Sequence, residues 1–229
     1  MHNVGVLGGF YIIADWIYRF AIVNLIWVLF NIPLVFLLFN LLLADTMGVV
    51  FVLTGMIFLL APFILYPSTT ALFAMVNCFI KKEDVKIFHD FWLYYKTNYK
   101  RSMRIGIVLA VFWIVLLIDF IYVVQAGNSV LTYIFIVLGF FVFIYQLLVC
   151  SGVNYIHGRV LDLFKHVATV MFGHPILSMS LGFISIVFLY IITQMLAIFL
   201  PFFSGSILAF LSLLVFIKIN PEEKHSSYE

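Results

Sequence analysis

Long tracts without charged side chains run through most of this sequence and constrain its fold more than any other feature. Four of them have the length of one membrane-crossing helix, which needs roughly 20 apolar residues to cover about 30 Å of hydrocarbon. These tracts cover residues 20–43, 48–66, 105–124 and 130–151, and Asp119 is the one charged residue in them. The pattern predicts helices that are surrounded by lipid rather than by water.

A fifth apolar tract, residues 176–219, is too long for a single crossing. As one helix it would extend about 66 Å, at about 1.5 Å per residue, and this is roughly twice the bilayer core. Pro201 and a following Ser-Gly-Ser sequence interrupt the tract. We therefore expect a hairpin with spans at 176–200 and 202–219, which brings the predicted number of transmembrane helices to about six.

The composition supports this interpretation and narrows the function. Hydrophobic residues make up 66% of the chain and charged residues 10%, whereas soluble domains carry about 25% charged residues. We therefore predict a single all-α membrane domain over residues 1–229, with the lipid bilayer as a partner. The net charge of only +2 gives no support to nucleic-acid binding. The amino-terminal segment has no basic leader before a short apolar run, so we expect no cleaved signal peptide.

The basic residues predict how the chain is oriented. Seven of the twelve Lys and Arg residues lie in the segment 81–104, and two more lie in 152–175. The connections 44–47 and 125–129 have none. With six spans, all twelve fall on the same side of the membrane, and the positive-inside rule places that side in the cytoplasm. We therefore predict a multi-pass protein of the cytoplasmic membrane, with these two loops and both termini in the cytoplasm.

The first predicted cytoplasmic loop is amphipathic. Its aromatic side chains recur at steps of three and four residues and share a helical face, namely Phe88, Phe91, Trp92, Tyr95 and Tyr99. An aromatic face beneath a basic one suits a helix in the lipid headgroup layer. The same face could instead dock on a partner protein or on the protein's own bundle. The residues predicted to contact the membrane surface or a partner are Lys82, Lys86, Phe88, Trp92, Tyr95, Lys100, Arg101 and Arg104.

The second predicted cytoplasmic loop repeats this arrangement. Its apolar stripe consists of Val153, Ile156, Val160, Phe164, Val167 and Met171. Polar residues such as Asp162 and Lys165 occupy the other faces. We therefore predict two amphipathic cytoplasmic segments, each placed between two membrane spans.

Two prolines interrupt the second predicted span. Pro62 and Pro67 each remove a backbone donor and favour a kink, and the segment 48–80 is too long for one straight crossing. We predict that the helix bends there and begins again with Ser68 or Thr69 as its N-cap. It would then continue along the inner membrane surface.

Several amide side chains lie within the apolar tracts. Asn24 and Asn31 lie seven residues apart, and thus on nearly one helical face, while Gln146 and Gln194 lie in later spans. Such amides usually tie helices together at about 1 kcal/mol each, but they can also line a path for a substrate. The candidate residues for a polar path are Asn31, Asp119 and Gln146.

Three small residues, Ser178, Gly182 and Ser185, share one face of the fifth predicted span. Small side chains at this spacing let a second helix approach closely. The sequence leaves open whether that helix belongs to the same chain or to a second copy, and packing within the chain is the commoner case.

The sequence lacks the common motifs of enzymes and metalloproteins. It contains no Gly-rich phosphate-binding loop, no HExxH pattern and no pair of histidines with i, i+4 spacing. No Ser-His-Asp arrangement can be assigned either. We therefore expect no catalytic activity, no cofactor and no metal site in this chain.

Three motifs in the first half of the chain point to a family. They are "NLIWVLFNIPLVFLLF" (24–39), "PFILYPSTTALFAMVNCFI" (62–80) and "EDVKIFHDFWLYYKTNYKRSMRIG" (83–106). In this order they resemble the YesL-like family of bacterial integral membrane proteins. The resemblance implies a bacterial cytoplasmic-membrane protein and carries over no catalytic residue. Because members of that family are often encoded beside carbohydrate ABC importers and two-component sensors, it also implies an accessory role in sugar uptake.

These observations lead to two hypotheses for the function. The first is a non-catalytic accessory or interaction protein, with components of an ABC sugar importer or a sensor as its partners. The alternative is a small membrane transporter or channel, because kinked spans and amides within the membrane are typical of transport sites.

Overall fold

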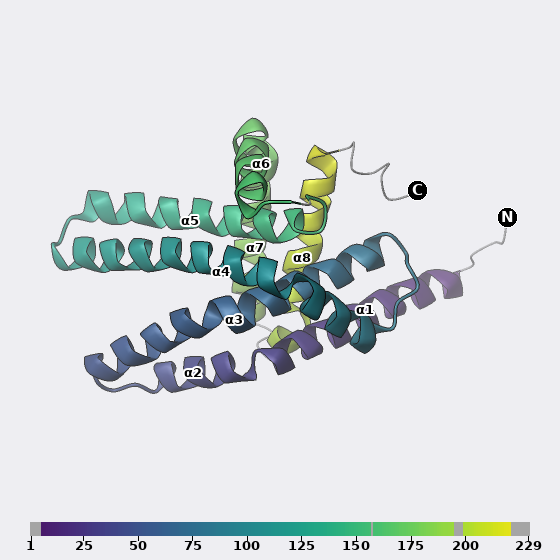
Figure 1. Ribbon diagram of the computed structural model, residues 1–229, viewed down its shortest axis with the longest axis horizontal. Helices are drawn as coiled ribbons and strands as arrows, with labels where there is room; N and C mark the ends of the chain where they lie inside the picture. Colours follow the sequence, from purple (N-terminus) through teal and green to yellow (C-terminus); the bar gives the residue numbers. More distant parts are fainter. Residues whose placement is uncertain (1–5, 157, 195–198, 221–229) are drawn as a thin grey trace.

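The computed structural model describes residues 6–156, 158–194 and 199–220, with side chains from residue 11 onward. All regular elements in this part of the chain are α-helices, which confirms the predicted all-α fold (Figure 1). They are α1 (Val6–Phe30), α2 (Ile32–Leu42), α3 (Met47–Ile80), α4 (Ile87–Gln125), α5 (Ser129–Gly152), α6 (Val160–Gly173), α7 (Pro175–Gln194) and α8 (Leu200–Ile219).

Six of these helices are long and apolar enough to cross a membrane, as the sequence predicts. They are α1, α3, α4, α5, α7 and α8, whereas α2 and α6 are shorter. Large apolar side chains point outward along much of the length of the six long helices, including those of Leu29, Phe51, Val111 and Ile184. Because soluble monomers rarely expose apolar patches of this extent, the fold is that of a polytopic membrane helix bundle.

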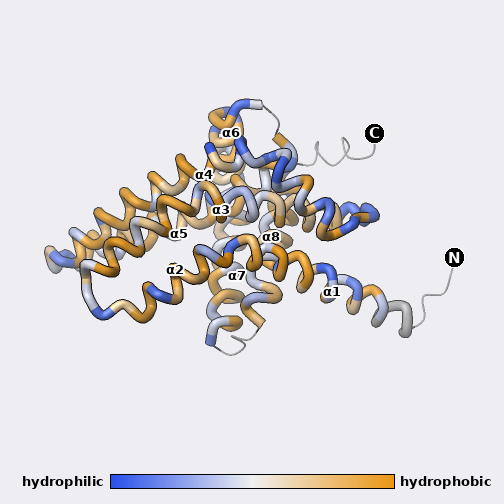
Figure 2. The backbone as a smooth tube through the Cα atoms, turned by 60° about the horizontal axis from the view of Figure 1, so that its bottom comes forward, coloured by the Kyte–Doolittle hydropathy of each residue, from blue (hydrophilic) through white to orange (hydrophobic). Residues whose placement is uncertain are grey.

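The helices run in two directions. Helices α1 to α5 extend along the longest axis of the molecule, and α6, α7 and α8 run across it (Figure 1). The connection 81–86 joins α3 to α4, and we call this end of the molecule the basic end because Lys81, Lys82 and Lys86 lie there. Hydrophilic stretches gather at the basic end and around α6, whereas the far parts of α3, α4 and α5 are mostly hydrophobic (Figure 2).

The first predicted span, 20–43, is wrong in its outline because the helix breaks at Asn31. Helix α1 ends at Phe30, and α2 begins at Ile32 with a proline in its first turn. Pro33 has no backbone N–H and so cannot continue the hydrogen-bond ladder of α1. The break leaves α1 as a complete apolar helix that reaches back to Val6.

Helix α3 corrects the prediction of a helix that begins again near Ser68. It is one continuous helix of 34 residues with Pro62 and Pro67 inside it, so neither Ser68 nor Thr69 is an N-cap. The Ser68 hydroxyl lies 2.8 and 2.9 Å from the carbonyl oxygens of Ile64 and Leu65 and donates within its own helix. Prolines are tolerated within membrane helices when local adjustments and neighbouring groups accommodate them, and the structure shows that Pro62 and Pro67 do not end α3.

Helix α4 corrects the predicted boundary between the loop 81–104 and the span 105–124. The loop comprises only residues 81–86, and Ile87–Gln125 is one helix of 39 residues, about 58 Å long. No proline interrupts this stretch, and its first half packs on α1 and α3 along its aromatic face. The amphipathic segment and the third apolar tract are therefore two halves of the same helix.

Helices α3 and α4 lie side by side and antiparallel. Near the basic end, the Cys78 sulfur lies 3.3 Å from the Tyr94 hydroxyl, and further along the Thr70 and Ser102 hydroxyls lie 2.6 Å apart. The closest approach is at Gly106, where an added Cβ would lie 2.9 Å from the Cα of Pro62. Only glycine allows the two backbones to approach so closely at this point.

The second predicted loop, 152–175, becomes the amphipathic helix α6 and its connections. Helix α6 begins at Val160, so Val153 and Ile156 of the predicted stripe lie outside it. Its buried residues are Leu163, Val167, Val170 and Met171, whereas Asp162 and Lys165 are exposed.

The small residues of α7 pack inside the bundle. Ser178, Gly182 and Ser185 are all buried. A Cβ on Gly182 would lie 2.6 Å from the side chains of Phe140 and Ile144 of α5. The stripe therefore serves the contact between α5 and α7 of the same chain.

Candidate functional site

Polar residues of the first two sequence motifs meet in the interior, where α1, α3, α4 and α8 join. We call this set of side chains the polar junction; it comprises Asn24, Trp27, Asn31, Ser68, Thr69, Thr70 and Ser102. Asn24 and Trp27 of α1 and Asn31 at its end follow one another at steps of three and four, so they lie along one side of the helix. This side is turned toward α3 and α8, so the junction connects α1 to these two helices.

Asn24 connects α1 to the start of α8. Its Nδ2 donates to the Pro201 carbonyl oxygen at 2.8 Å, and its Oδ1 accepts from the Ser206 N–H at 2.8 Å. Both partners are backbone groups in the first two turns of α8, so the amide of Asn24 holds the start of this helix against α1. Gly205 makes room for the contact, because a Cβ there would lie 2.8 Å from Leu72 and 3.0 Å from Asn24 Oδ1.

Trp27 and Asn31 connect α1 to the proline-containing part of α3. Trp27 Nε1 donates to the Thr69 hydroxyl at 3.1 Å, and Asn31 Nδ2 donates to the Ser68 hydroxyl at 2.8 Å. Asn31 Nδ2 also donates to the Trp27 carbonyl oxygen at 2.7 Å. Its Oδ1 is buried and has no hydrogen-bond partner among the described residues. The junction therefore contains one acceptor that is left unpaired at the break between α1 and α2.

The structure does not bring together the three residues of the predicted polar path. Asn31 belongs to the polar junction, and Gln146 of α5 accepts a hydrogen bond from Trp113 Nε1 of α4 at 2.7 Å. Asp119 lies exposed on α4, near the end of the helix that is remote from the basic end. Each of the three side chains thus has its own surroundings, and no hydrogen bond joins any two of them in the described structure.

Most of the aromatic face of α4 docks on the protein's own bundle. Phe91 is buried, and its ring centroid lies 5.1 Å from that of Phe30 at the end of α1. Tyr95 lies 4.9 Å from the same ring and stacks on Trp92 at 5.6 Å. The sequence leaves open whether this face lies on lipid, on a partner protein or on the protein's own bundle. These side chains dock on the bundle. Phe88 differs from them, because it is 68% exposed.

The predicted basic residues fall into two groups. Arg101 points inward, and its guanidinium donates to the carbonyl oxygens of Val153 and Ile156, at the carboxyl end of α5. Lys82, Lys86, Lys100 and Arg104 are exposed; Lys82 has a positive φ of 58° in the turn after α3. Arg101 therefore ties α4 to the end of α5, while the other four cations face outward.

An exposed face remains along the first half of α4, and we call it the α4 surface. It consists of Phe88, Trp92, Leu93, Lys96, Lys100 and Arg104. Leu93 and Lys96 are new members that the sequence-based prediction missed, although their spacing of three or four residues from the others places them on the same face. Lys96 Nζ lies 4.6 Å from the centre of the Trp92 ring, which is a cation–π contact.

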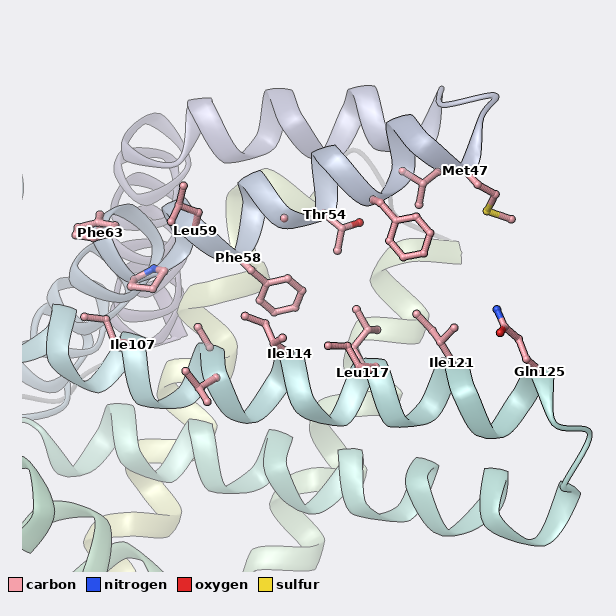
Figure 3. Close-up of a pocket in the computed structure, with 17 residues that line it drawn as sticks. Met47, Thr54, Phe58, Leu59, Phe63, Ile107, Ile114, Leu117, Ile121 and Gln125 are labelled. Atoms are coloured by element: carbon pink, nitrogen blue, oxygen red, sulfur yellow. The ribbon is translucent and has the colours of Figure 1, made fainter.

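A long groove separates the first half of α3 from the second half of α4 (Figure 3). Its volume is about 840 Å³, and Phe58 from α3 points toward Ile114 and Leu117 of α4. Thr54 and Gln125 supply polar atoms, and no charged residue lines the groove. A sugar site would need several converging hydrogen-bond groups, so this lining suits hydrocarbon better than carbohydrate.

Metal ligands do not gather in the described part of the chain, where no group of three or more His, Cys, Asp or Glu residues could hold an ion. The two cysteines, Cys78 and Cys150, are separate and buried.

The fold and these sites define a polytopic α-helical membrane protein, and comparisons with known proteins relate part of it to a family. A family model described as "Protein of unknown function, DUF624" matches residues 20–120. The uncharacterized protein YteU of Bacillus subtilis (strain 168) is 32% identical over 120 residues, which is 52% of this chain and 43% of the relative's own length. No solved structure matches the chain.

The family match covers some of the regions described above and leaves others outside. Its residues, 20–120, include the whole polar junction and the whole α4 surface. Helices α5 to α8 lie outside it. The first half of the chain is therefore similar to the DUF624 family, and the residues that make up the polar junction and the α4 surface belong to that half.

Proposed function

We propose that this chain is a non-catalytic multi-pass protein of the YesL-like type that serves carbohydrate uptake or sensing as an accessory or interaction protein. The resemblance of its three motifs to that family supports the link to carbohydrates. The one-sided distribution of Lys and Arg supports a place in the bacterial cytoplasmic membrane with both termini inside. The α4 surface carries the proposal of an interaction.

The order of side chains along α4 favours a protein partner over lipid at the amino-terminal end of the α4 surface, where Phe88 and Leu93 lie. Beyond Arg104, the outward residues Ile107 and Val111 are apolar, as expected in hydrocarbon. In the other direction, Leu93 lies 11 residues from Arg104, which is about 16 Å along the helix. Cations near the end of a span mark the headgroup layer. Phe88 and Leu93 would then lie beyond that layer, where lipid tails cannot cover them.

The composition of the α4 surface indicates which kind of surface on a partner would bind it. Phe88 and Leu93 are 68% and 53% exposed, and Lys96 and Lys100 follow them along the helix. Interfaces commonly place an apolar centre within a polar rim and match charges across the contact. We therefore expect a partner with a small apolar pocket bordered by acidic groups, on a component of an ABC sugar importer or of a sensor.

The test is recovery of the partner from native membranes with the full-length tagged protein. In the double variant Phe88→Ala/Leu93→Ala, recovery of importer or sensor components should fall by tenfold or more, while the amount of the protein itself stays the same. The matched control is Tyr133→Ala/Val137→Ala, which removes two exposed side chains of α5 and should leave recovery unchanged. Equal recovery in the double variant, together with unchanged sugar uptake in a deletion strain, would show that the proposal is wrong.

A small transporter or channel is the second candidate, and the helix break at Asn31 is the observation that favours it. Broken helices with unpaired polar atoms form substrate sites in many transporters, and Asn31 Oδ1 is such an atom. This candidate predicts solute flux in reconstituted vesicles that falls when Asn31, Asp119 or Gln146 is replaced by Leu. Flux equal to that of empty vesicles would exclude it for the solutes tried.

A further inference from the structure

A second groove, separate from that between α3 and α4, lies where α4, α5 and α6 meet. Its volume is about 450 Å³, which falls within the range of roughly 300–1,000 Å³ that is typical of small-ligand sites. Phe112 of α4, Phe141 of α5 and Phe164 of α6 are among the residues that line it. The one hydroxyl in the lining, that of Tyr145, already donates to the Phe164 carbonyl oxygen at 2.8 Å. The groove therefore suits an apolar ligand.

Helix α6 contributes an apolar stripe that the bundle covers only in part, because Phe164 stacks on Tyr145 while both ends of the stripe are exposed. Leu161, Phe164, Ala168 and Phe172 follow one another at steps of three and four and all line the groove. Leu161 is 62% exposed and Phe172 75%. This stripe is distinct from the buried face of α6, and on a surface that faces water it would be expected to carry polar residues. An apolar medium must therefore cover it.

A cation lies at the end of this groove that is nearer the basic end. Arg104 precedes Val108, a lining residue, by one turn of α4 and is exposed. Its Nε donates to the Lys100 carbonyl oxygen at 3.2 Å. Among the described residues, no hydrogen bond or ion pair engages its two terminal nitrogens. These nitrogens form the planar fork that binds a phosphate through two parallel hydrogen bonds.

We propose that this groove binds an anionic phospholipid of the leaflet at the basic end, with one acyl chain running along α4 and across the apolar stripe of α6, and the phosphate on Arg104. The distances fit, because Phe112 lies eight residues from Arg104, about 12 Å along the helix. One leaflet of hydrocarbon is roughly 15 Å thick, half of the bilayer core. A chain that starts at the level of Arg104 therefore reaches the whole length of the groove. Basic pockets between membrane helices hold lipid headgroups in the same way.

The larger groove between α3 and α4 serves as an internal comparison. It has almost twice the volume, about 840 Å³ against about 450 Å³, and its lining comes from α3 and α4 alone. Neither lining contains a cation, and Arg104 lies one turn of α4 before Ile107 of the larger groove as well as before Val108 of the smaller one. The smaller groove differs through the stripe of α6, so a variant in that stripe separates binding in the two grooves.

The experiment compares lipid binding to the purified full-length protein by native mass spectrometry. Phosphatidylglycerol is the anionic probe, and phosphatidylcholine of the same acyl chains is the zwitterionic one. The wild-type protein should retain phosphatidylglycerol preferentially, and Arg104→Gln should weaken this binding about tenfold, as expected for the loss of one charge-assisted pair. Arg104→Lys should retain part of it. The matched control Lys96→Gln, which removes an exposed cation two turns away, should leave binding unchanged.

A second variant tests the groove itself. Ala168→Trp places a large side chain among the residues that line it and should reduce retention of both lipids. If this variant does not fold, Leu161→Gln, at an exposed position of the same stripe, replaces it with the same expected result. Equal retention of the two lipids by the wild-type protein, or an unchanged preference in Arg104→Gln, would overturn the proposal.

Discussion

The polar junction and the α4 surface both belong to the first half of the chain, yet they differ in every physical respect. The junction is buried, and its amides and hydroxyls hold α1, α3, α4 and α8 together through specific hydrogen bonds. The α4 surface is exposed, and its aromatic, aliphatic and cationic side chains make few contacts within the chain. One region therefore determines the assembly of the bundle, and the other is available to a partner.

This difference shows how polar residues in a hydrophobic sequence should be interpreted. An amide within an apolar tract attracts attention as a substrate contact, but Asn24 uses its amide fully to join α1 to α8. In a membrane, where water cannot satisfy such groups, helix contacts are their usual partners. A search for function in this protein therefore begins with exposed side chains that lack such partners.

The largest effect on assembly is expected at Gly106. Gly106→Val places side-chain atoms against Tyr66 and the backbone of Pro62, so the free energy of unfolding should fall by about 1–3 kcal/mol or more. This change in the free energy of unfolding is measured by unfolding the purified protein in detergent. The matched control is Gly55→Val on α3, because nothing lies within 4 Å of an added Cβ there. Equal stability of the two variants would contradict the close approach of α3 and α4.

The next largest effect is expected at Asn24. Asn24→Leu leaves the Pro201 carbonyl oxygen and the Ser206 N–H without their partner, at a cost of about 1–2 kcal/mol. Asn40→Leu is the control, because Asn40 is only partly buried and bonds only within α2, to the Phe36 carbonyl oxygen. The same unfolding measurement should show little change for this control. If both variants lose stability equally, Asn24 has no special role in joining the helices.

A double-mutant cycle measures one bond of the junction by itself. Trp27→Phe and Thr69→Val each remove one side of the 3.1 Å hydrogen bond, and the coupling energy should be about 0.6 kcal/mol, the average for such pairs in membranes. The pair Trp113 and Gln146, with a distance of 2.7 Å between α4 and α5, provides the comparison outside the junction. If the coupling energy is zero for Trp27 and Thr69 but not for Trp113 and Gln146, the hydrogen bond of the junction does not stabilise the fold.

The smallest effect on stability is expected on the α4 surface. Phe88→Ala/Leu93→Ala should change the free energy of unfolding by no more than about 0.5 kcal/mol per residue, because exposed positions contribute little to the fold. A loss as large as that of Asn24→Leu would mean that these side chains belong to the core. The contrast between the two regions would then disappear.

The sequence predicted the class of fold because it depends on local composition. Long uncharged tracts indicate helices in lipid wherever they occur, and six such helices are present in the described part of the chain. The aromatic spacing also placed Phe91 and Tyr95 correctly on one face, but it could not show what that face touches. Their partner, Phe30, is some 60 residues away in the sequence, and periodicity carries no information on contacts of that range.

The helix boundaries could not be predicted for a related reason. Pro67 suggests a helix end, but α3 continues through it, whereas α1 ends just before Pro33. A proline in the sequence therefore does not decide by itself whether a helix ends. Arg104 was predicted to contact the membrane surface or a partner, but the groove between α4, α5 and α6 could not be predicted, because α6 supplies one of its walls.

The central claim is that Phe88 and Leu93 of the α4 surface lie in the aqueous phase on the cytoplasmic side of a six-pass membrane protein, and thiol labelling tests it most directly. Both native cysteines are buried, so Leu93→Cys and Ala126→Cys each introduce one accessible thiol, at opposite ends of α4. With a membrane-impermeant reagent on intact cells, position 126 should be labelled and position 93 should be labelled only after the membrane is opened. Labelling of position 93 in intact cells would contradict the account.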